Sequence, residues 1–99
     1  MAQPIYSMFM GRFIEAWYQL SEKEQNKLLD KIEAINKKLG VERIIVCESG
    51  WSNDEWQFFG VEKFPSAEVK QEHYKLLDEM QWFRYIESKV LLGTAWRRD

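Results

Sequence analysis

The two side chains best suited to chemistry in this sequence are its single histidine and its single cysteine, His73 and Cys47. A histidine titrates near neutral pH, so in a pocket it can act as a general base or anchor a polar ligand. A lone histidine without a placed partner equally fits the edge of a core, hydrogen-bonded to a neighbour such as a backbone carbonyl. Cys47 lies in a β-branched segment, which is typical of a buried, inert thiol. No metal-ligand spacing links these residues to the carboxylates, so we expect no metal site.

Aromatic residues are the second group that could form a site. The expected topology places seven of them at one pole: Trp17, Tyr18, Trp51, Trp56, Trp82, Phe83 and Tyr85. They could line the mouth of a pocket for a flat or apolar ligand. They could also plug that end of the molecule as a small core, and the sequence leaves both open.

The opposite pole is expected to hold His73 with Tyr6 and Trp96, which argues against one site that uses both groups. Arg12 and Glu48 are charges within predicted strands, where they would pair, hold a polar ligand or simply be solvated. Alternation alone does not assign either one to a face. The candidate catalytic residue is therefore His73, and the candidate ligand-binding residues are Trp17, Trp56, Trp82, Tyr85, Tyr6 and Arg12.

Strand and helix signals divide the chain into six elements. Apolar and β-branched patterning predicts strands over residues 5–16, 43–49, 56–64 and 90–96. The first helix has a capping box at Ser21 and Glu24 and a glycine stop at Gly40. Its inner stripe is Leu28, Ile32, Ile35 and Leu39. The second helix is capped by Ser66 and carries the stripe Val69, His73, Leu76, Met80 and Phe83; it can break at Gln81-Trp82 before continuing toward Glu87.

This order predicts one α+β domain over residues 1–99, a ferredoxin-like βαββαβ sandwich. Its four-stranded antiparallel sheet carries both helices on one face, with the first and third strands central. The other face would keep some of Met8, Phe9, Met10, Phe58, Phe59, Val61, Leu91 and Leu92 exposed. A patch of that size usually meets a partner, most simply a second copy in a two-fold dimer. The alternative is a monomer with a moderately apolar open face.

Composition argues against several classes of partner. A net charge of −2, from 14 basic and 16 acidic side chains, lacks the attraction that dominates nucleic-acid binding. The third-strand run over residues 54–62 is acidic and its glycine is displaced, unlike an RNA-recognition motif. The apolar run over residues 5–10 is too short for a signal peptide or a membrane span. One cysteine excludes an internal disulfide, and we expect a cytoplasmic protein with no membrane or nucleic-acid partner.

Three stretches carry a family resemblance over nearly the whole chain: WYQLSEKE from Trp17, WQFFGVEKFPS from Trp56, and Trp82-Phe83-Arg84-Tyr85. Together they resemble a family of small, uncharacterised microbial proteins similar in layout to the dimeric α+β-barrel superfamily. That superfamily includes antibiotic-biosynthesis monooxygenases, muconolactone isomerases, stress-responsive barrel proteins and haem-degrading enzymes. The resemblance implies a sheet-to-sheet dimer and a pocket between sheet and helices. The asparagine of the haem-degrading members is missing from the first strand, and the tryptophan–histidine spacing differs.

The expected function is therefore that of a homodimer that binds a small, largely apolar or aromatic molecule between sheet and helices. A cofactor-free oxygenation, isomerisation or cyclisation of that molecule would make it an enzyme, and no cofactor is expected. The alternative is a non-enzymatic ligand-sensing or protein-interaction module. Part of this expectation is analogy with the superfamily, because a fold does not fix a function.

Overall fold

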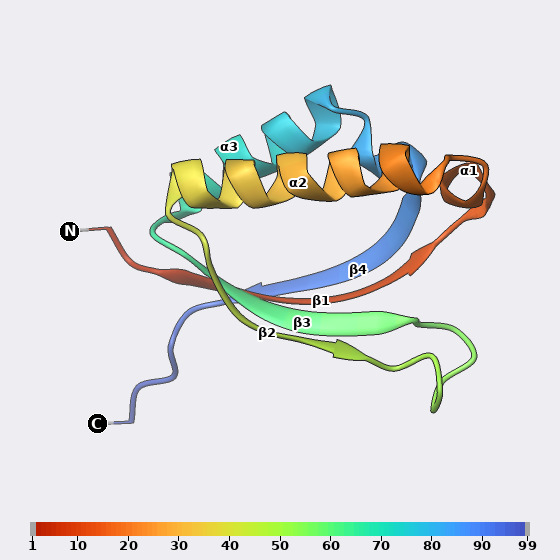
Figure 1. The fold of residues 1–99 in the computed structure, drawn as a ribbon. Helices are drawn as coiled ribbons and strands as arrows, with labels where there is room; N and C mark the ends of the chain where they lie inside the picture. Colours follow the sequence, from red (N-terminus) through yellow and green to blue (C-terminus); the bar gives the residue numbers. More distant parts are fainter. Residues whose placement is uncertain (1, 99) are drawn as a thin grey trace.

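The computed structural model, which describes residues 2–98, consists of one antiparallel sheet with the helices layered on one of its faces (Figure 1). The strands are β1 (Ile5–Phe13), β2 (Glu42–Glu48), β3 (Phe58–Phe64) and β4 (Ile86–Gly93). Their order in the sheet is β2-β3-β1-β4, so β1 and β3 are central. The α+β class and the four-stranded antiparallel sheet are confirmed, and the layout is compatible with a ferredoxin-like sandwich.

The helices are α1 (Glu15–Tyr18), α2 (Glu22–Leu39) and α3 (Ala67–Glu79), and a 3-10 turn, η1 (Trp82–Arg84), follows α3. Local signals set the ends of α2 as predicted. Ser21 Oγ accepts a hydrogen bond of 3.1 Å from the Glu24 amide, and the Glu24 carboxylate accepts one of 3.0 Å from the Ser21 amide. These bonds hold the pKa of Glu24 below its usual value. Gly40 ends the helix with a φ of 72°, a left-handed conformation that suits glycine.

The start of α3 was also predictable, because Ser66 Oγ accepts a hydrogen bond of 3.2 Å from the Val69 amide. Its end was not. The break anticipated at Gln81-Trp82 is present, but the continuation of the helix toward Glu87 and a strand that starts at residue 90 are both wrong. The helix breaks at Gln81, whose φ is 61°, and β4 begins at Ile86. Pairing of Phe13 with Ile86 and of Arg12 with Glu87 lengthens β4 at the expense of the helix.

The first predicted strand is too long as well. β1 ends at Phe13, and residues 15–18 turn into α1 instead of continuing the sheet to Ala16. The Ile14 amide donates to the Tyr85 carbonyl at 3.1 Å, one step beyond the Phe13–Ile86 pair, and the chain then leaves the sheet. The turn folds Trp17 back, and its ring stacks on Phe13 with centroids 4.3 Å apart. Burial of that large ring stabilises the turn.

Two further strand ends differ from the prediction. β3 starts at Phe58 rather than Trp56, because Asn53 Oδ1 accepts hydrogen bonds from the amides of Glu55 and Trp56 and keeps that segment in the loop. β4 ends at Gly93, so Trp96 lies beyond the sheet and is 91% exposed. In both places the β propensity of a tryptophan, Trp56 or Trp96, favours a strand that does not extend to it.

Alternation along the strands separates the two faces of the sheet. The cross-strand pairs Ser7–Glu62 and Phe9–Gly60 face the helices, and the intervening pair Met8–Val61 faces away. Gly60 is required on the helix side, because a Cβ there would lie 2.6 Å from the Ile45 carbonyl oxygen and 2.7 Å from the Phe9 ring. The face away from the helices is uncovered in Figure 1 and mostly apolar. Its exposed large side chains include Met8, Ile45, Phe59 and Leu91.

Candidate functional site

A partly open cavity of about 910 Å³ lies between the sheet and the helices. Both layers contribute to its wall, and most of that wall is apolar. Among the apolar lining residues are Phe9, Ile32, Val46, Leu77, Val90 and Leu92. Val46, Val90 and Leu92 face the helices but are about half exposed, because the helices do not seal the sheet at its two edge strands. A cavity of this size and character is typical of a small-molecule site.

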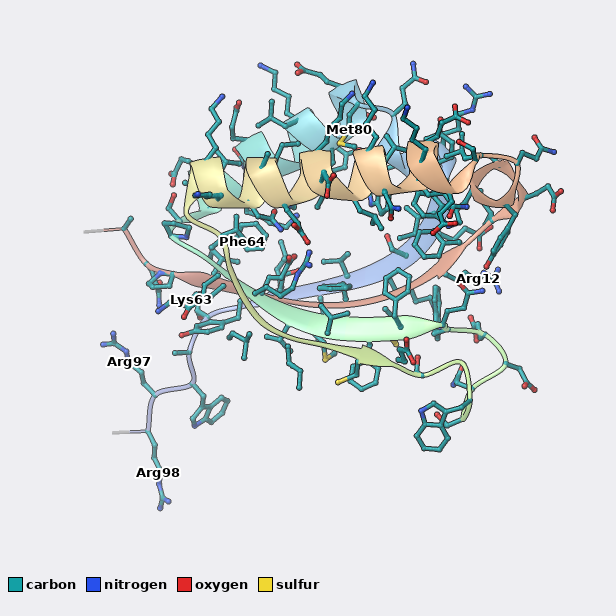
Figure 2. The ribbon with its side chains drawn as sticks, in the orientation of Figure 1. Arg12, Lys63, Phe64, Met80, Arg97 and Arg98 are labelled. Atoms are coloured by element: carbon teal, nitrogen blue, oxygen red, sulfur yellow. The ribbon has the colours of Figure 1, made fainter. Side chains whose placement is uncertain are left out.

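One end of the cavity is built around His73, which lies on α3 and is 5% exposed. Its Nε2 lies 2.8 Å from Oδ1 of Asn36, a buried residue of α2. An amide oxygen only accepts hydrogen bonds, so this contact assigns the ring proton to Nε2. The ring also meets Phe64 edge-on, with centroids 5.0 Å apart, and Figure 2 shows Phe64 between the two layers. The histidine is therefore held by one polar and one aromatic contact.

The other ring nitrogen, Nδ1, is buried and has no hydrogen-bond partner within the part of the chain that the structure describes. Burial, together with the smaller effects of the positive charges of Lys70 and Arg43, lowers the pKa of His73 to about 4. At neutral pH the imidazole is thus uncharged, and Nδ1 carries a lone pair. A buried acceptor without a donor is costly. It is the one such side-chain atom found in residues 2–98.

Three charged side chains share this end of the cavity. Glu62, on the helix side of β3, is 7% exposed, and Arg43 of β2 places Nε and Nη2 each 3.4 Å from its carboxylate. Lys70 of α3 is half-buried, with its Nζ 5.1 Å from the centre of the Phe64 ring. Burial lowers the pKa of Lys70, and the negative charge of Glu62 opposes that shift. Two cations therefore lie near one buried carboxylate, and Glu33 and Glu48 add two further acidic side chains to the cavity wall.

The other end of the interlayer is packed with aromatic rings. Trp17 and Trp82 are both buried and meet edge-on, with centroids 5.8 Å apart. Phe13 stacks on Trp17 and meets Trp82 edge-on at 6.1 Å. Tyr85 packs against the same cluster, 6.3 Å from Trp17. These rings form the aromatic end of the molecule, and of the predicted ligand-binding set only Trp82 also lines the cavity.

The remaining predicted site residues lie elsewhere. Arg12 shares the open face with Met8 by alternation, and its guanidinium pairs with Glu87 at 2.6 Å. Its Cζ also lies 5.7 Å from the centre of the Trp56 ring. Tyr6 is on the same face, with Lys63 Nζ 6.0 Å from its ring. Thus Arg12 and Trp56 come together, but outside the cavity wall, and Tyr6 joins neither them nor His73.

The predicted separation of His73 from the aromatic pole is wrong in one respect. His73 and Trp82 lie toward opposite ends, but a single continuous cavity is lined by both. Strand direction predicts at which end of the sheet each residue lies. It does not predict whether the space between the sheet and the helices is filled or open. Alternation in the sequence does not assign Glu48 to either face of the sheet, and the structure places it in the lining of this cavity.

Four residues of the polar end were not singled out from the sequence: Asn36, Arg43, Glu62 and Lys70. Two of them carried a readable signal. Asn36 follows Ile32 by four positions, so it lies on the inner stripe of its helix. Glu62 alternates with Phe58, Gly60 and Phe64 and so shares their buried face. A polar residue on an otherwise apolar face is a signal for a functional site, and both Asn36 and Glu62 carry this signal.

Within residues 2–98 no group of three His, Cys, Asp or Glu side chains converges as a metal site would need. No helix of this part of the chain is long and apolar enough to cross a bilayer. Comparison of the sequence with known proteins finds no matching family model and no similar curated protein. The geometry of the cavity is therefore the basis for a functional proposal.

Proposed function

We propose that this protein binds a small, largely apolar or aromatic molecule in the cavity between its sheet and its helices. The observation that carries the proposal is a mostly apolar cavity of about 910 Å³ whose polar groups gather at one end. Apolar walls with a few convergent polar groups are the usual design of a ligand site, in which the walls supply affinity and the polar groups orient the ligand. The unpartnered Nδ1 of His73 adds a reason to expect an occupant.

We further propose that the binding form is a homodimer joined through the open sheet face, in the manner of a dimeric α+β barrel. Leu91 is 64% exposed on that face, its cross-strand partner Met8 is also exposed, and so is Phe59 on β3. Contiguous apolar surface of this kind is typical of an interface, and a two-fold axis lets one patch cover its own copy.

Sedimentation analysis tests the dimer. Leu91→Glu introduces a charge within the proposed interface, and we expect it to convert the dimer to a monomer. Ala34→Glu adds the same charge on the exposed surface of α2 and should leave the dimer intact. A wild-type chain that remains monomeric at several hundred micromolar would contradict the proposed interface.

A cofactor-free reaction on the bound molecule is the enzymatic form of this proposal, with His73 as the base. Nδ1 carries the free lone pair that proton abstraction requires. Substrate consumption measured without added cofactor, abolished by His73→Ala with the fold retained, would support it. The expected reaction class is oxygenation, isomerisation or cyclisation of an apolar or aromatic substrate.

One observation favours binding without turnover, as in a ligand sensor or an interaction module. A histidine with a pKa of about 4 is a weak base at neutral pH, and an amide rather than a carboxylate orients it. Asn36 cannot stabilise an imidazolium as a carboxylate would. A screen that finds ligands bound at the cavity but unchanged after prolonged incubation supports this second function.

A further inference from the structure

The polar end of the cavity places a buried acceptor beside cationic side chains, and this combination selects among ligand head groups. His73 Nδ1 has no donor among the described residues, while Nε2 is already bound to Asn36. A matching ligand must therefore supply an O–H or N–H donor at this point. Arg43 is already paired with Glu62, so Lys70 is the cation available to face the same ligand atom, and this atom should carry partial negative charge. An ammonium group meets the first requirement and is repelled by Lys70.

We propose that this end of the cavity binds the hydroxyl group of a phenol or enol carried on a flat, apolar body. Because Nδ1 is buried, a small movement of the His73 ring must first uncover it. The hydroxyl then donates to Nδ1, and its oxygen, partly negative, faces Lys70. The inference rests on the proposed ligand-binding function and names the chemical class of the ligand. The rest of the molecule lies along the apolar walls toward Trp82.

A carboxylate is the nearest competitor and fits less well. Beside Lys70 and Arg43 a carboxylic acid is ionised, and a carboxylate has no proton to donate, so Nδ1 would stay unpaired. It would also lie near the buried carboxylate of Glu62, which repels it. A phenol keeps its proton at neutral pH and so satisfies Nδ1 without a second full charge.

The first experiment compares three ligands of one shape by calorimetry: 2-naphthol, 2-methylnaphthalene and 2-naphthoate. We expect 2-naphthol to bind about tenfold tighter than 2-methylnaphthalene, since it alone pairs the buried lone pair. 2-Naphthoate should be weaker than 2-naphthol. Equal affinity of 2-naphthol and 2-methylnaphthalene, or tightest binding of 2-naphthoate, would overturn the head-group assignment but leave ligand binding intact. Absence of binding by all three would overturn the proposed function and the inference with it.

His73→Gln tests the residue itself. A glutamine amide can still donate to Asn36 from the position of Nε2, but it has no acceptor where Nδ1 stands. We expect the variant to lose the preference for 2-naphthol and to bind 2-methylnaphthalene within about twofold of wild type. A preference that survives in the folded variant would overturn the role of Nδ1.

Lys70→Met gives a second reading that does not depend on His73. The probe is 4-nitrophenol, which ionises near neutral pH with a visible colour change. We expect the bound phenol to ionise at higher pH in Lys70→Met than in wild type, because one cation has been removed from its surroundings. Lys63→Met removes the same charge from the opposite face of the sheet and should change nothing. Identical ionisation in the Lys70→Met variant and wild type would refute the proposed orientation of the head group.

Discussion

The aromatic end and the polar end of the interlayer differ in how completely their side chains are satisfied. Around Trp17 the rings meet one another at distances typical of stacked and edge-on pairs, and little interaction capacity is left. Around His73 the polar groups are less completely satisfied, because Nδ1 has no donor among the described residues and Lys70 is partly desolvated. Packed aromatic rings stabilise a fold, whereas a buried acceptor without a donor destabilises it. The contrast indicates that the aromatic end maintains the structure, and it supports our proposal of a ligand at the polar end.

The first prediction concerns the aromatic end and is the largest. Trp17→Ala removes a buried ring that touches Phe13, Trp82 and Tyr85, and we expect the free energy of unfolding to fall by about 3–5 kcal/mol. Urea denaturation measures this change. Trp96→Ala, at a position that is 91% exposed, is the control and should change stability by less than about 0.5 kcal/mol. A small effect at Trp17 would mean that the aromatic end does not maintain the fold.

The second prediction is the pH dependence of the polar end. The pKa of His73 is about 4 in the folded chain, below its ordinary value of 6.5, because the neutral form is favoured by burial and by Lys70 and Arg43. Its stabilising contribution is therefore complete above pH 6.5 and is lost as the pH falls toward 4. The loss is at most about 3 kcal/mol.

Stability curves of wild type and His73→Gln over this pH range isolate that contribution from the titration of carboxylates, which both chains share. Lys70, Arg43 and Asn36, which act on His73, are unchanged in the variant. Parallel curves between pH 6.5 and 4 would show that His73 titrates normally and is not desolvated.

The third prediction separates the two contacts of His73. Asn36→Ala removes the acceptor of the Nε2 proton and leaves a second ring nitrogen unpaired, so we expect a loss of about 1–3 kcal/mol. The His73→Gln background provides a double-mutant cycle: coupling between positions 36 and 73 should persist, because glutamine can donate to the same oxygen. A loss near zero for Asn36→Ala would show that water replaces the amide and that the polar end is wetter than its burial indicates.

The smallest effect is expected for an ion pair that belongs to neither end. Arg12 and Glu87 are joined at 2.6 Å on the open face, but their side chains are 40% and 52% exposed. Glu87→Gln should reduce the free energy of unfolding of the monomer by less than about 1 kcal/mol, with salt weakening the effect further. Thermal unfolding at low and high ionic strength checks this. A larger loss that depends on protein concentration would place the pair in a dimer interface.

Element starts and stops were predictable wherever a local group makes the contact. Ser21 with Glu24, Gly40 and Ser66 act within a few residues of themselves, so their sequence neighbours are sufficient to identify them. Boundaries failed where a distant partner decides. Ile86 is in a strand because it pairs with Phe13. Residues 15–18 form a turn because the Trp17 ring packs against Phe13 and Trp82.

The site shows the same division. His73 could be selected from the sequence as the only histidine on an inner stripe, yet its partner Asn36 lies 37 positions earlier on another helix. Arg43 and Glu62 meet only because β2 pairs with β3, and the register of that pair shifts between Arg43 and Ile45. Trp56 and Tyr6 were selected as aromatic residues at the right poles, and the structure places both outside the cavity wall. The type of a residue and the end of the sheet at which it lies can be predicted from the sequence. Whether its side chain lines a cavity cannot.

What the sequence by itself determined is the order of elements, the α+β class and the apolar character of both sheet faces, because period, caps and composition act locally and add along the chain. The tertiary structure alone decided that a cavity remains between the layers and that His73 Nδ1 is buried there without a donor among residues 2–98. Both depend on the distance between elements that are remote in sequence. That distance is set by the whole set of packed side chains, such as Phe64 and Trp82, rather than by any one segment.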